Sequence, residues 1–262
     1  MKIKLLLPLS ILTTMILTNG CSDHSEHDAH DEHSAKKHAV HWGYTGHEAP
    51  KHWGALSPEY STCSTGRMQT PINIIPTQDA DNTPLEFNYV TSATSVVNNG
   101  HTVQVNIAPG SNVMIDGLAY ELKQFHFHTP SENNINSHTF PLEAHFVHAT
   151  PDGKLAVVAV MFTRGRDNPM IEKIWSKFPL YINEPVKMEL TSNNIQSIMP
   201  RDKDYYKFMG SLTTPPCSEN VKWNVLKIAM PISTEQVDKF FRVFGHTNNR
   251  PIQPSNGRVI SE

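Results

Sequence analysis

The chain has 262 residues, which is long enough for one large domain with a substantial core. Its formal net charge of -3, without a basic stripe or an RNA-binding motif, argues against nucleic acid as a partner. At the N-terminus, Lys2 and Lys4 precede a mostly apolar stretch over residues 5–17 that is too short to cross a bilayer. We therefore predict that residues 1–20 form a signal peptide, which is excluded from the fold.

Cys21 follows the sequence Leu-Thr-Asn-Gly and ends a segment that resembles a bacterial lipobox. Lipidation of Cys21 would anchor the exported chain to a membrane; simple cleavage nearby is the alternative. Residues 21–40 are polar and rich in histidine, with no apolar period, so we predict a disordered tether there. A tail that gathers zinc is the other interpretation. We expect the protein to be exported, in the periplasm or the outer envelope.

Residues 41–262 predict one domain of the mainly β class. Short β-rich runs, separated by Gly, Pro, Asn and Asp, predict a sheet with irregular connections. These runs are 96–97, 102–107, 113–115, 155–162 and 221–228. Helical signals are few. Asn168 and Pro169 predict a capped helix over residues 168–175, and Ser233 with the acidic residues that follow predicts a second over 233–241.

The most informative motif is the run Gln-Phe-His-Phe-His at residues 124–128, which is followed later by Glu-Ala-His at 143–145. Alternate residues of a strand share a face, so Gln124, His126 and His128 point one way. The same parity puts Glu143, His145 and Val147 on one face of a second strand. Two such strands can bring three imidazoles onto one metal, with Gln124 and Glu143 placed to accept the second ring N–H of a ligand.

Three neutral imidazoles hold Zn²⁺ and leave one tetrahedral position open, which is typical of a catalytic site. Water in the open position is acidified and becomes a strong nucleophile. The alternative is a set of ordinary core histidines, but a His-x-His pair joined to a Glu-x-His on the same face favours a metal. His148 has the opposite parity to His145 and is not expected to join the metal site.

These motifs resemble the α-class carbonic anhydrases, and the Pro-Ser-Glu-Asn sequence at 130–133 resembles their bacterial branch. The resemblance extends from His41 to Pro254, nearly the whole mature chain. Further matching motifs lie at residues 41–44, 69–74, 97–101, 210–217 and 248–254. It implies the α-carbonic anhydrase fold, with a large twisted, mostly antiparallel central sheet and short peripheral helices. It also implies a zinc-dependent lyase that interconverts CO₂ and bicarbonate.

The resemblance implies roles for individual residues. Thr213 matches the threonine that orients the zinc-bound nucleophile, and Glu132 the carboxylate that accepts a hydrogen bond from that threonine. Thr214 is expected to contact bicarbonate. Asn248 matches a buried residue bonded to one ligand histidine. The apolar wall of the CO₂ pocket corresponds to Val147, Val157, Leu212 and Trp223, for which plain core packing is the alternative.

His101 matches the family's proton shuttle, which carries the proton of each cycle from the metal site to buffer. Polar residues that order the connecting waters correspond to Tyr44, Asn99 and Gln104. Gln104 stands where many relatives have Asn, a departure that affects the water chain. Cys63 and Cys217 match the positions of a disulfide in exported members of the family, which would also hold the loop that contains Thr213.

Two other functions compete with the enzyme. The first is a non-catalytic anhydrase-like binding domain, but such relatives usually lack a zinc histidine. The second is a zinc-acquisition or storage lipoprotein, suggested by the histidine-rich residues 21–40. Deletion of residues 22–40 distinguishes the enzyme from the zinc store, because an enzyme keeps its turnover whereas a store loses zinc capacity. The stretch between His128 and His145 is shorter than in the animal enzymes, which is compatible with a homodimer.

Overall fold

The computed structural model describes residues 40–179 and 181–262. The predicted signal peptide, Cys21 and residues 21–39 of the predicted tether lie outside these residues. Within the described ranges, no helix is both long enough and apolar enough to cross a membrane.

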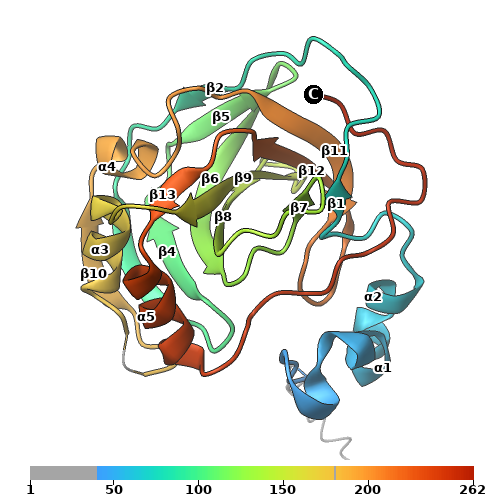
Figure 1. Ribbon diagram of the computed structural model, residues 1–262, viewed down its shortest axis with the longest axis horizontal. Helices are drawn as coiled ribbons and strands as arrows, with labels where there is room; N and C mark the ends of the chain where they lie inside the picture. The colour runs from blue at the N-terminus through green and yellow to red at the C-terminus, as the bar shows by residue number, and fades with distance from the viewer. Residues whose placement is uncertain (1–39, 180) are drawn as a thin grey trace, which may run out of the picture. The chain divides into compact units, whose positions relative to one another are not determined.

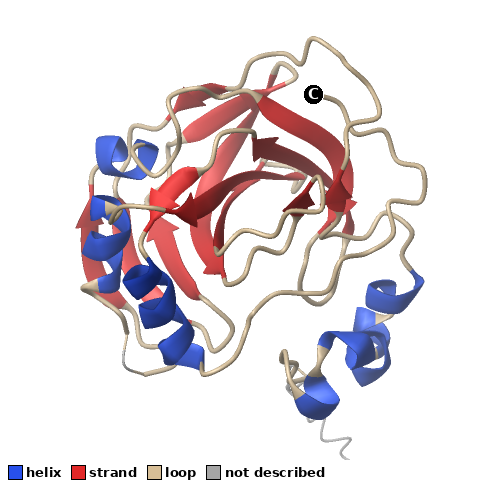
Figure 2. Ribbon diagram, in the orientation of Figure 1, coloured by secondary structure: helices blue, strands red, loops and turns tan. Residues whose placement is uncertain are grey.

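Residues 40–262 are built around one large sheet, drawn in red in Figure 2. Its 11 strands include the run β10-β3-β4-β6-β8-β9-β12-β11, and a separate two-stranded sheet pairs β1 with β7. Most neighbouring strands are antiparallel, whereas β9 pairs in parallel with β12 and β13. The bounds are β1 Asn73–Ile74, β2 Glu86–Asn88, β3 Ala93–Asn98, β4 Val103–Ile107, β5 Asn112–Ile115, β6 Leu118–His128, β7 Asn134–Ile135, β8 Leu142–Ala149, β9 Leu155–Arg164, β10 Val186–Leu190, β11 Tyr205–Ser211, β12 Glu219–Leu226 and β13 Met230–Ile232. The predicted fold class is confirmed.

The helices are short and lie around the sheet (Figure 1). The bounds are η1 Gly46–Glu48, η2 Pro50–His52, α1 Trp53–Leu56, η3 Pro58–Tyr60, α2 Thr62–Thr65, α3 Pro169–Trp175, α4 Ser192–Gln196 and α5 Thr234–Phe244. Both predicted helices are present. The side chain of Asn168 accepts from the first-turn backbone of α3, and Ser233 forms a capping box with Gln236 at α5.

The two faces of the central strands have different neighbours. Phe125 and Phe127 of β6 are fully buried in the main core, on the face that α3 and α5 cover. The ring of Phe127 packs edge-on against Trp175 of α3, with centroids 4.8 Å apart, and Trp175 stacks on Phe240 of α5. Because successive residues alternate between faces, this packing turns His126 and His128 to the opposite side of the sheet.

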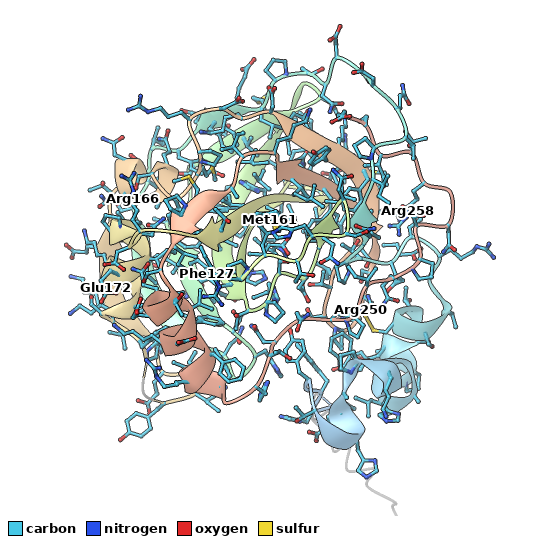
Figure 3. The ribbon with its side chains drawn as sticks, viewed as in Figure 1. Phe127, Met161, Arg166, Glu172, Arg250 and Arg258 are labelled. Carbon is cyan, nitrogen blue, oxygen red and sulfur yellow. A yellow bond between two sulfur atoms is a disulfide. The ribbon has the colours of Figure 1, made fainter. Side chains whose placement is uncertain are left out.

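The N-terminal helices are tied to the rest of the domain by Arg250, which is buried next to the disulfide (Figure 3). Its guanidinium donates to the carbonyl of Cys63, to the side chain of Gln69 and to the carbonyl of Thr70, each at 2.8 Å. The structure contains the predicted disulfide between Cys63 and Cys217. These contacts join residues up to 187 positions apart, so the segment before β1 is fixed on the domain.

Candidate metal centre and its cleft

The strands β6 and β8 bring three imidazoles to one point. Their antiparallel register pairs His126 with His145 and His128 with Glu143. One ring nitrogen from each of His126, His128 and His145 lies within 4.8 Å of the other two. The ring centroids are 4.6 to 5.3 Å apart. Among the described residues, this is the one cluster of His, Cys, Asp and Glu with such convergence.

The other nitrogen of each ring has a partner outside the cluster. Nδ1 of His126 lies 2.8 Å from Oε1 of Gln124, and Nδ1 of His128 lies 2.7 Å from the backbone carbonyl of Asn248. Nε2 of His145 is 2.9 Å from Oε1 of Glu143, although the ring N–H is not aimed well enough for a hydrogen bond. The nitrogens that remain are Nε2 of His126, Nε2 of His128 and Nδ1 of His145.

Burial decides the charge of these rings. It lowers the pKa of all three imidazoles below their ordinary value, most strongly for His126 and His145. The neutral form therefore prevails at neutral pH, and a neutral imidazole is the form that binds a metal.

Glu132 lies directly beside the cluster, with Oε2 3.4 Å from Nε2 of His128 and 3.9 Å from Nδ1 of His145. Its Oε1 accepts from the backbone N–H of Arg250 at 2.8 Å. Burial raises the pKa of Glu132 to about 8, while the hydrogen bond from the backbone N–H of Arg250 and the nearby hydroxyl of Thr213 lower it. Oε2 itself has no hydrogen bond of good geometry, so Thr213 is near the carboxyl without a well-aligned contact. A cation at the ring nitrogens would oppose the effect of burial, lower the pKa of Glu132 and favour the carboxylate.

Comparison with known proteins identifies the family. The model of the eukaryotic-type carbonic anhydrase family matches residues 48–262, most of the chain. The chain belongs to the α-carbonic anhydrase family. A carbonic anhydrase of Pectobacterium carotovorum is 46% identical over 222 residues, which are 85% of this chain and 91% of that protein. One of Neisseria gonorrhoeae is 46% identical over 224 residues, 85% of this chain and 88% of that one.

A solved structure of an α-carbonic anhydrase has the same fold as this chain. The α-carbonic anhydrase of Thermovibrio ammonificans, in complex with the inhibitor sulfanilamide, has a TM-score of 0.82 and 43% sequence identity. It covers 86% of this chain and all of its own. The resemblance seen in the sequence motifs, including the bacterial character, is therefore confirmed.

The four apolar residues that match the family's CO₂ pocket lie together beside the cluster. Val147, Val157 and Trp223 stand directly opposite one another on the adjacent strands β8, β9 and β12. Trp223 packs edge-on against His145, with ring centroids 4.9 Å apart. Leu212 packs on the same group, and its N–H donates to the carbonyl of Ser218 across the loop that contains Thr213 and Thr214.

A cavity of about 130 Å³ opens from the cluster. His101, Tyr44, Asn99, Gln104 and Thr214, all singled out from the sequence, line it together with His126 and His128. Trp42 lines it as well, and its ring stacks on His101 with centroids 3.7 Å apart. Sequence reasoning missed this contact, because Trp42 is one of several aromatic residues in a segment without strand or helix periodicity.

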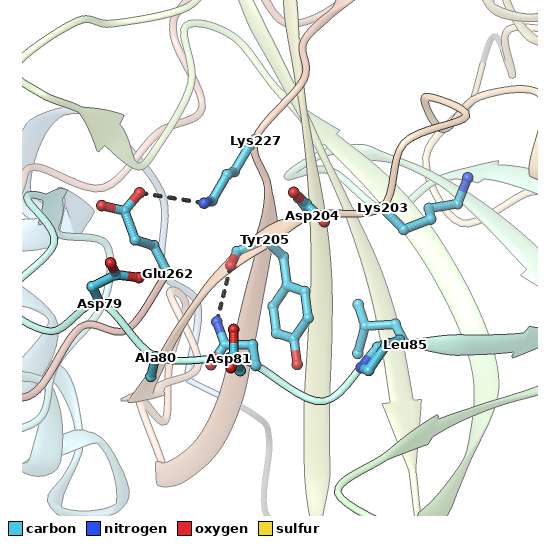
Figure 4. A pocket seen from close by; sticks show the side chains of 11 residues that line it. Asp79, Ala80, Asp81, Leu85, Lys203, Asp204, Tyr205, Lys227 and Glu262 are labelled. Atoms are coloured by element: carbon cyan, nitrogen blue, oxygen red, sulfur yellow. Dashed lines mark hydrogen bonds and ion pairs between the residues drawn. The ribbon is translucent and has the colours of Figure 1, made fainter.

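A larger cavity, of about 510 Å³, lies elsewhere on the domain (Figure 4). Its lining includes Asp79, Asp204 and Tyr205, and Lys227 pairs with Glu262 at 3.3 Å beside it. It contains none of the residues singled out from the sequence. The three-histidine cluster points to the smaller cavity instead, since volume alone says nothing about reactive groups.

His148 has the position that strand parity predicts. It is fully buried on the core face of β8, where the hydroxyl of Tyr89 lies 2.7 Å from its Nε2. Burial lowers the pKa of His148 to about 3. It is a neutral structural histidine and not part of the metal cluster.

Proposed function

We propose that this carbonic anhydrase family member binds one Zn²⁺ at His126, His128 and His145 and catalyses the reversible hydration of CO₂ to bicarbonate and a proton. The observation that carries the proposal is the convergence of three neutral ring nitrogens within 4.8 Å, with hydrogen-bond partners behind His126 and His128 and the carboxyl group of Glu143 close behind His145. Such backing fixes the tautomer and the orientation of a ligand before the metal arrives.

The donor set fits zinc. Nε2 of His128 is buried and has no hydrogen-bond partner among the described residues, which is costly unless the nitrogen binds something. Imidazole nitrogens are favoured zinc ligands, and three of them leave a fourth position for substrate. When bound, zinc supplies Lewis acidity that makes water nucleophilic at neutral pH.

Thr213 and Glu132 are proposed to set the direction of attack. The carboxylate of Glu132 lies against the ring nitrogens and accepts from the backbone of Arg250, so its position is fixed. A Thr213 hydroxyl that donates to Glu132 has only lone pairs to offer toward the metal side. It would thus accept a hydrogen bond from the nucleophile and so turn a lone pair of the nucleophile toward CO₂. Thr214 lines the cavity, which supports the proposal that it contacts bicarbonate.

CO₂ is small and apolar, and it needs a surface that does not bind water strongly. Val147, Val157, Leu212 and Trp223 offer such a surface next to His145. These apolar side chains would hold CO₂ beside His145, whereas the cavity at His126 and His128 is lined by polar side chains such as Tyr44, Asn99 and Gln104. We infer that CO₂ and the exported proton use different groups of residues.

His101 is proposed to carry the proton from the metal site, with Tyr44, Asn99 and Gln104 ordering the water between them. All four line the same cavity. In the orientation stacked on Trp42, burial and the neighbouring rings of His41 and His246 lower the pKa of His101 to about 4. A ring with so low a pKa accepts a proton poorly at neutral pH. Proton export therefore needs a change in ring orientation or a further acceptor.

We also propose that the protein is exported and anchored through a lipid on Cys21. The charged and apolar residues at the N-terminus support export, and the Cys63–Cys217 disulfide suits an oxidising compartment. Mass spectrometry of the protein from membranes would show a lipid-modified N-terminal Cys21; a mature N-terminus beyond Cys21 would contradict it.

Stopped-flow CO₂ hydration with the purified mature chain, with zinc measured on the same sample, tests the proposal. We expect fast turnover, about one zinc per chain, and inhibition by sulfanilamide, the inhibitor bound in the Thermovibrio ammonificans relative. Bound zinc without turnover would contradict the enzymatic proposal and would favour zinc storage or binding.

A further inference from the structure

A second histidine lies beside His101 at the mouth of the cleft. The rings of His41 and His101 are 6.2 Å apart between centroids and tilted by 44°. The contact joins the start of the described chain to the turn between β3 and β4. The Trp42 ring, stacked on His101 from the adjacent position in the sequence, holds the two histidines in this arrangement.

We propose that His41 is a second proton acceptor, which takes the proton from His101 and passes it to buffer. The inference rests on the proposed function, because it concerns the fate of the proton that CO₂ hydration produces. One N–H bond of the His101 imidazolium breaks and one forms on His41, through an intervening water. A buffer base then removes that proton, so neither ring changes over a full cycle.

The surroundings of His41 suit this exchange. Its side chain is 73% exposed, so buffer reaches it directly. Nδ1 of His41 lies 3.1 Å from Oε1 of Glu48, a contact that orients the ring and leaves Nε2 for exchange. The backbone on either side is fixed, since the carbonyl of Val40 accepts from the hydroxyl of Tyr60 and the N–H of Gly43 donates to the carbonyl of Glu48.

His101 alone is poorly placed to finish the transfer. It is half-buried under Trp42, and burial is the largest cause of its lowered pKa. A proton on this ring is unstable and moves readily to an exposed acceptor nearby. The other candidates are His246 and Tyr44, whose rings contact each other at 6.2 Å on the cavity side. Nδ1 of His246 is already engaged with the carbonyl of Thr247, and burial raises the pKa of Tyr44 far above neutrality.

The test is the His41→Gln variant of the zinc-loaded full chain, assayed for CO₂ hydration in weak and in strong buffer. We expect kcat in weak buffer to fall roughly three- to tenfold, less than the ~10²-fold typical of a directly positioned acid or base, because solvent competes with His41. We expect kcat/KM to be unchanged, since proton export follows the conversion of CO₂. Imidazole buffer restores kcat.

His47→Gln is the matched control, because the His47 ring pairs with His52 at 6.4 Å on the same N-terminal segment. It should keep full kcat in both buffers. In the double variant His41→Gln/His101→Gln, a relay in series predicts no loss beyond that of His101→Gln alone. Losses that multiply would overturn the series arrangement.

An unchanged kcat for His41→Gln in weak buffer would overturn the proposal, and so would a comparable loss in the His47→Gln control. A loss seen only in His246→Gln would assign the relay to that ring instead. Failure of the proposed function is distinguishable, because the unmodified chain would then show no kcat/KM for CO₂ at all.

Discussion

The floor of the cleft and its mouth are built in different ways. At the floor, the three histidines stand on two neighbouring strands, and their backing groups come mostly from the same strands. At the mouth, Trp42 and His41 from the N-terminal segment meet His101 from the turn between β3 and β4. The floor is fixed by strand register, and the mouth depends on the attachment of a segment that has little regular structure.

Because the floor and the mouth are built differently, changes in the two regions should affect different kinetic parameters. Changes at the floor should affect metal binding and kcat/KM, because these depend on the position of the ring nitrogens. Changes at the mouth should affect kcat and its dependence on buffer. The disulfide and Arg250 connect the two regions, since Arg250 donates to Cys63, near the N-terminus, and to Glu132, beside the metal cluster.

The largest effect is expected at the floor. His126→Ala removes one of three ligands and should abolish both zinc retention and CO₂ hydration. Metal analysis after dialysis and stopped-flow assay measure the two. The exposed His138 supplies a matched control, because His138→Ala leaves the cluster intact. Full activity in His126→Ala would refute the assignment of the site.

A smaller loss of activity is expected for Thr213, which is proposed to orient the nucleophile but does not bind the metal. Thr213→Val keeps the shape of the side chain but removes the hydroxyl. We expect kcat/KM to fall by roughly 10²-fold, the size typical for one lost orienting hydrogen bond, with zinc content unchanged. Equal kcat/KM in Thr213→Val and the unmodified chain would show that the hydroxyl has no orienting role.

Gln124→Ala removes the group behind the His126 ring, at 2.8 Å from Nδ1. Zinc affinity should fall about 10- to 100-fold, as is common when the partner of a metal-bound histidine is lost. Competition with a chelator measures it. Gln104→Ala is the control, since Gln104 pairs with His126 across the strands but donates its side chain to Asn106. A comparable drop in the control would mean that the effect is only structural.

The disulfide tests the connection between the two regions. Replacing Cys63 and Cys217 by Ser should lower the free energy of unfolding by about 2–5 kcal/mol, the usual range for a native bond closing a long loop. Urea denaturation measures the change. We expect kcat in weak buffer and kcat/KM both to fall, because the bond holds the N-terminal segment at the mouth and the loop that contains Thr213 at the floor. Unchanged values of both would show that the bond connects neither region to the reaction.

The smallest effect concerns acid stability. The pKa of His148 in the folded protein, about 3, lies below its ordinary value of 6.5. Above pH 6.5 the ring is neutral in both the folded and the unfolded chain, so the shift costs no stability. As pH falls from 6.5 toward 3, the unfolded chain binds a proton that the folded protein does not, and the free energy of unfolding decreases. His148→Gln should remove this loss, worth about 2 kcal/mol at pH 5 from the linkage relation. Urea midpoints of both proteins at pH 5 and 7 give the value. An identical pH dependence would show that His148 is not buried in neutral form.

The sequence predicts the floor well, because two strands with period-2 alternation fix which side chains share a face. His126, His145 and the opposite placement of His148 all follow from that rule. It does not predict the contact between Trp42 and His101 or the position of Arg250. Those depend on contacts between segments up to 187 residues apart, for which local patterns carry no signal. The short helices from η1 to α2 were missed because each spans only 3 or 4 residues.

The central claim is that the three ring nitrogens bind zinc. Anomalous diffraction at the zinc absorption edge, on crystals of the zinc-loaded mature chain, tests it directly. We predict a single strong peak per chain, surrounded by Nε2 of His126, Nε2 of His128 and Nδ1 of His145. A cluster without a peak, or zinc bound only at the histidine-rich residues 21–40, would contradict the account.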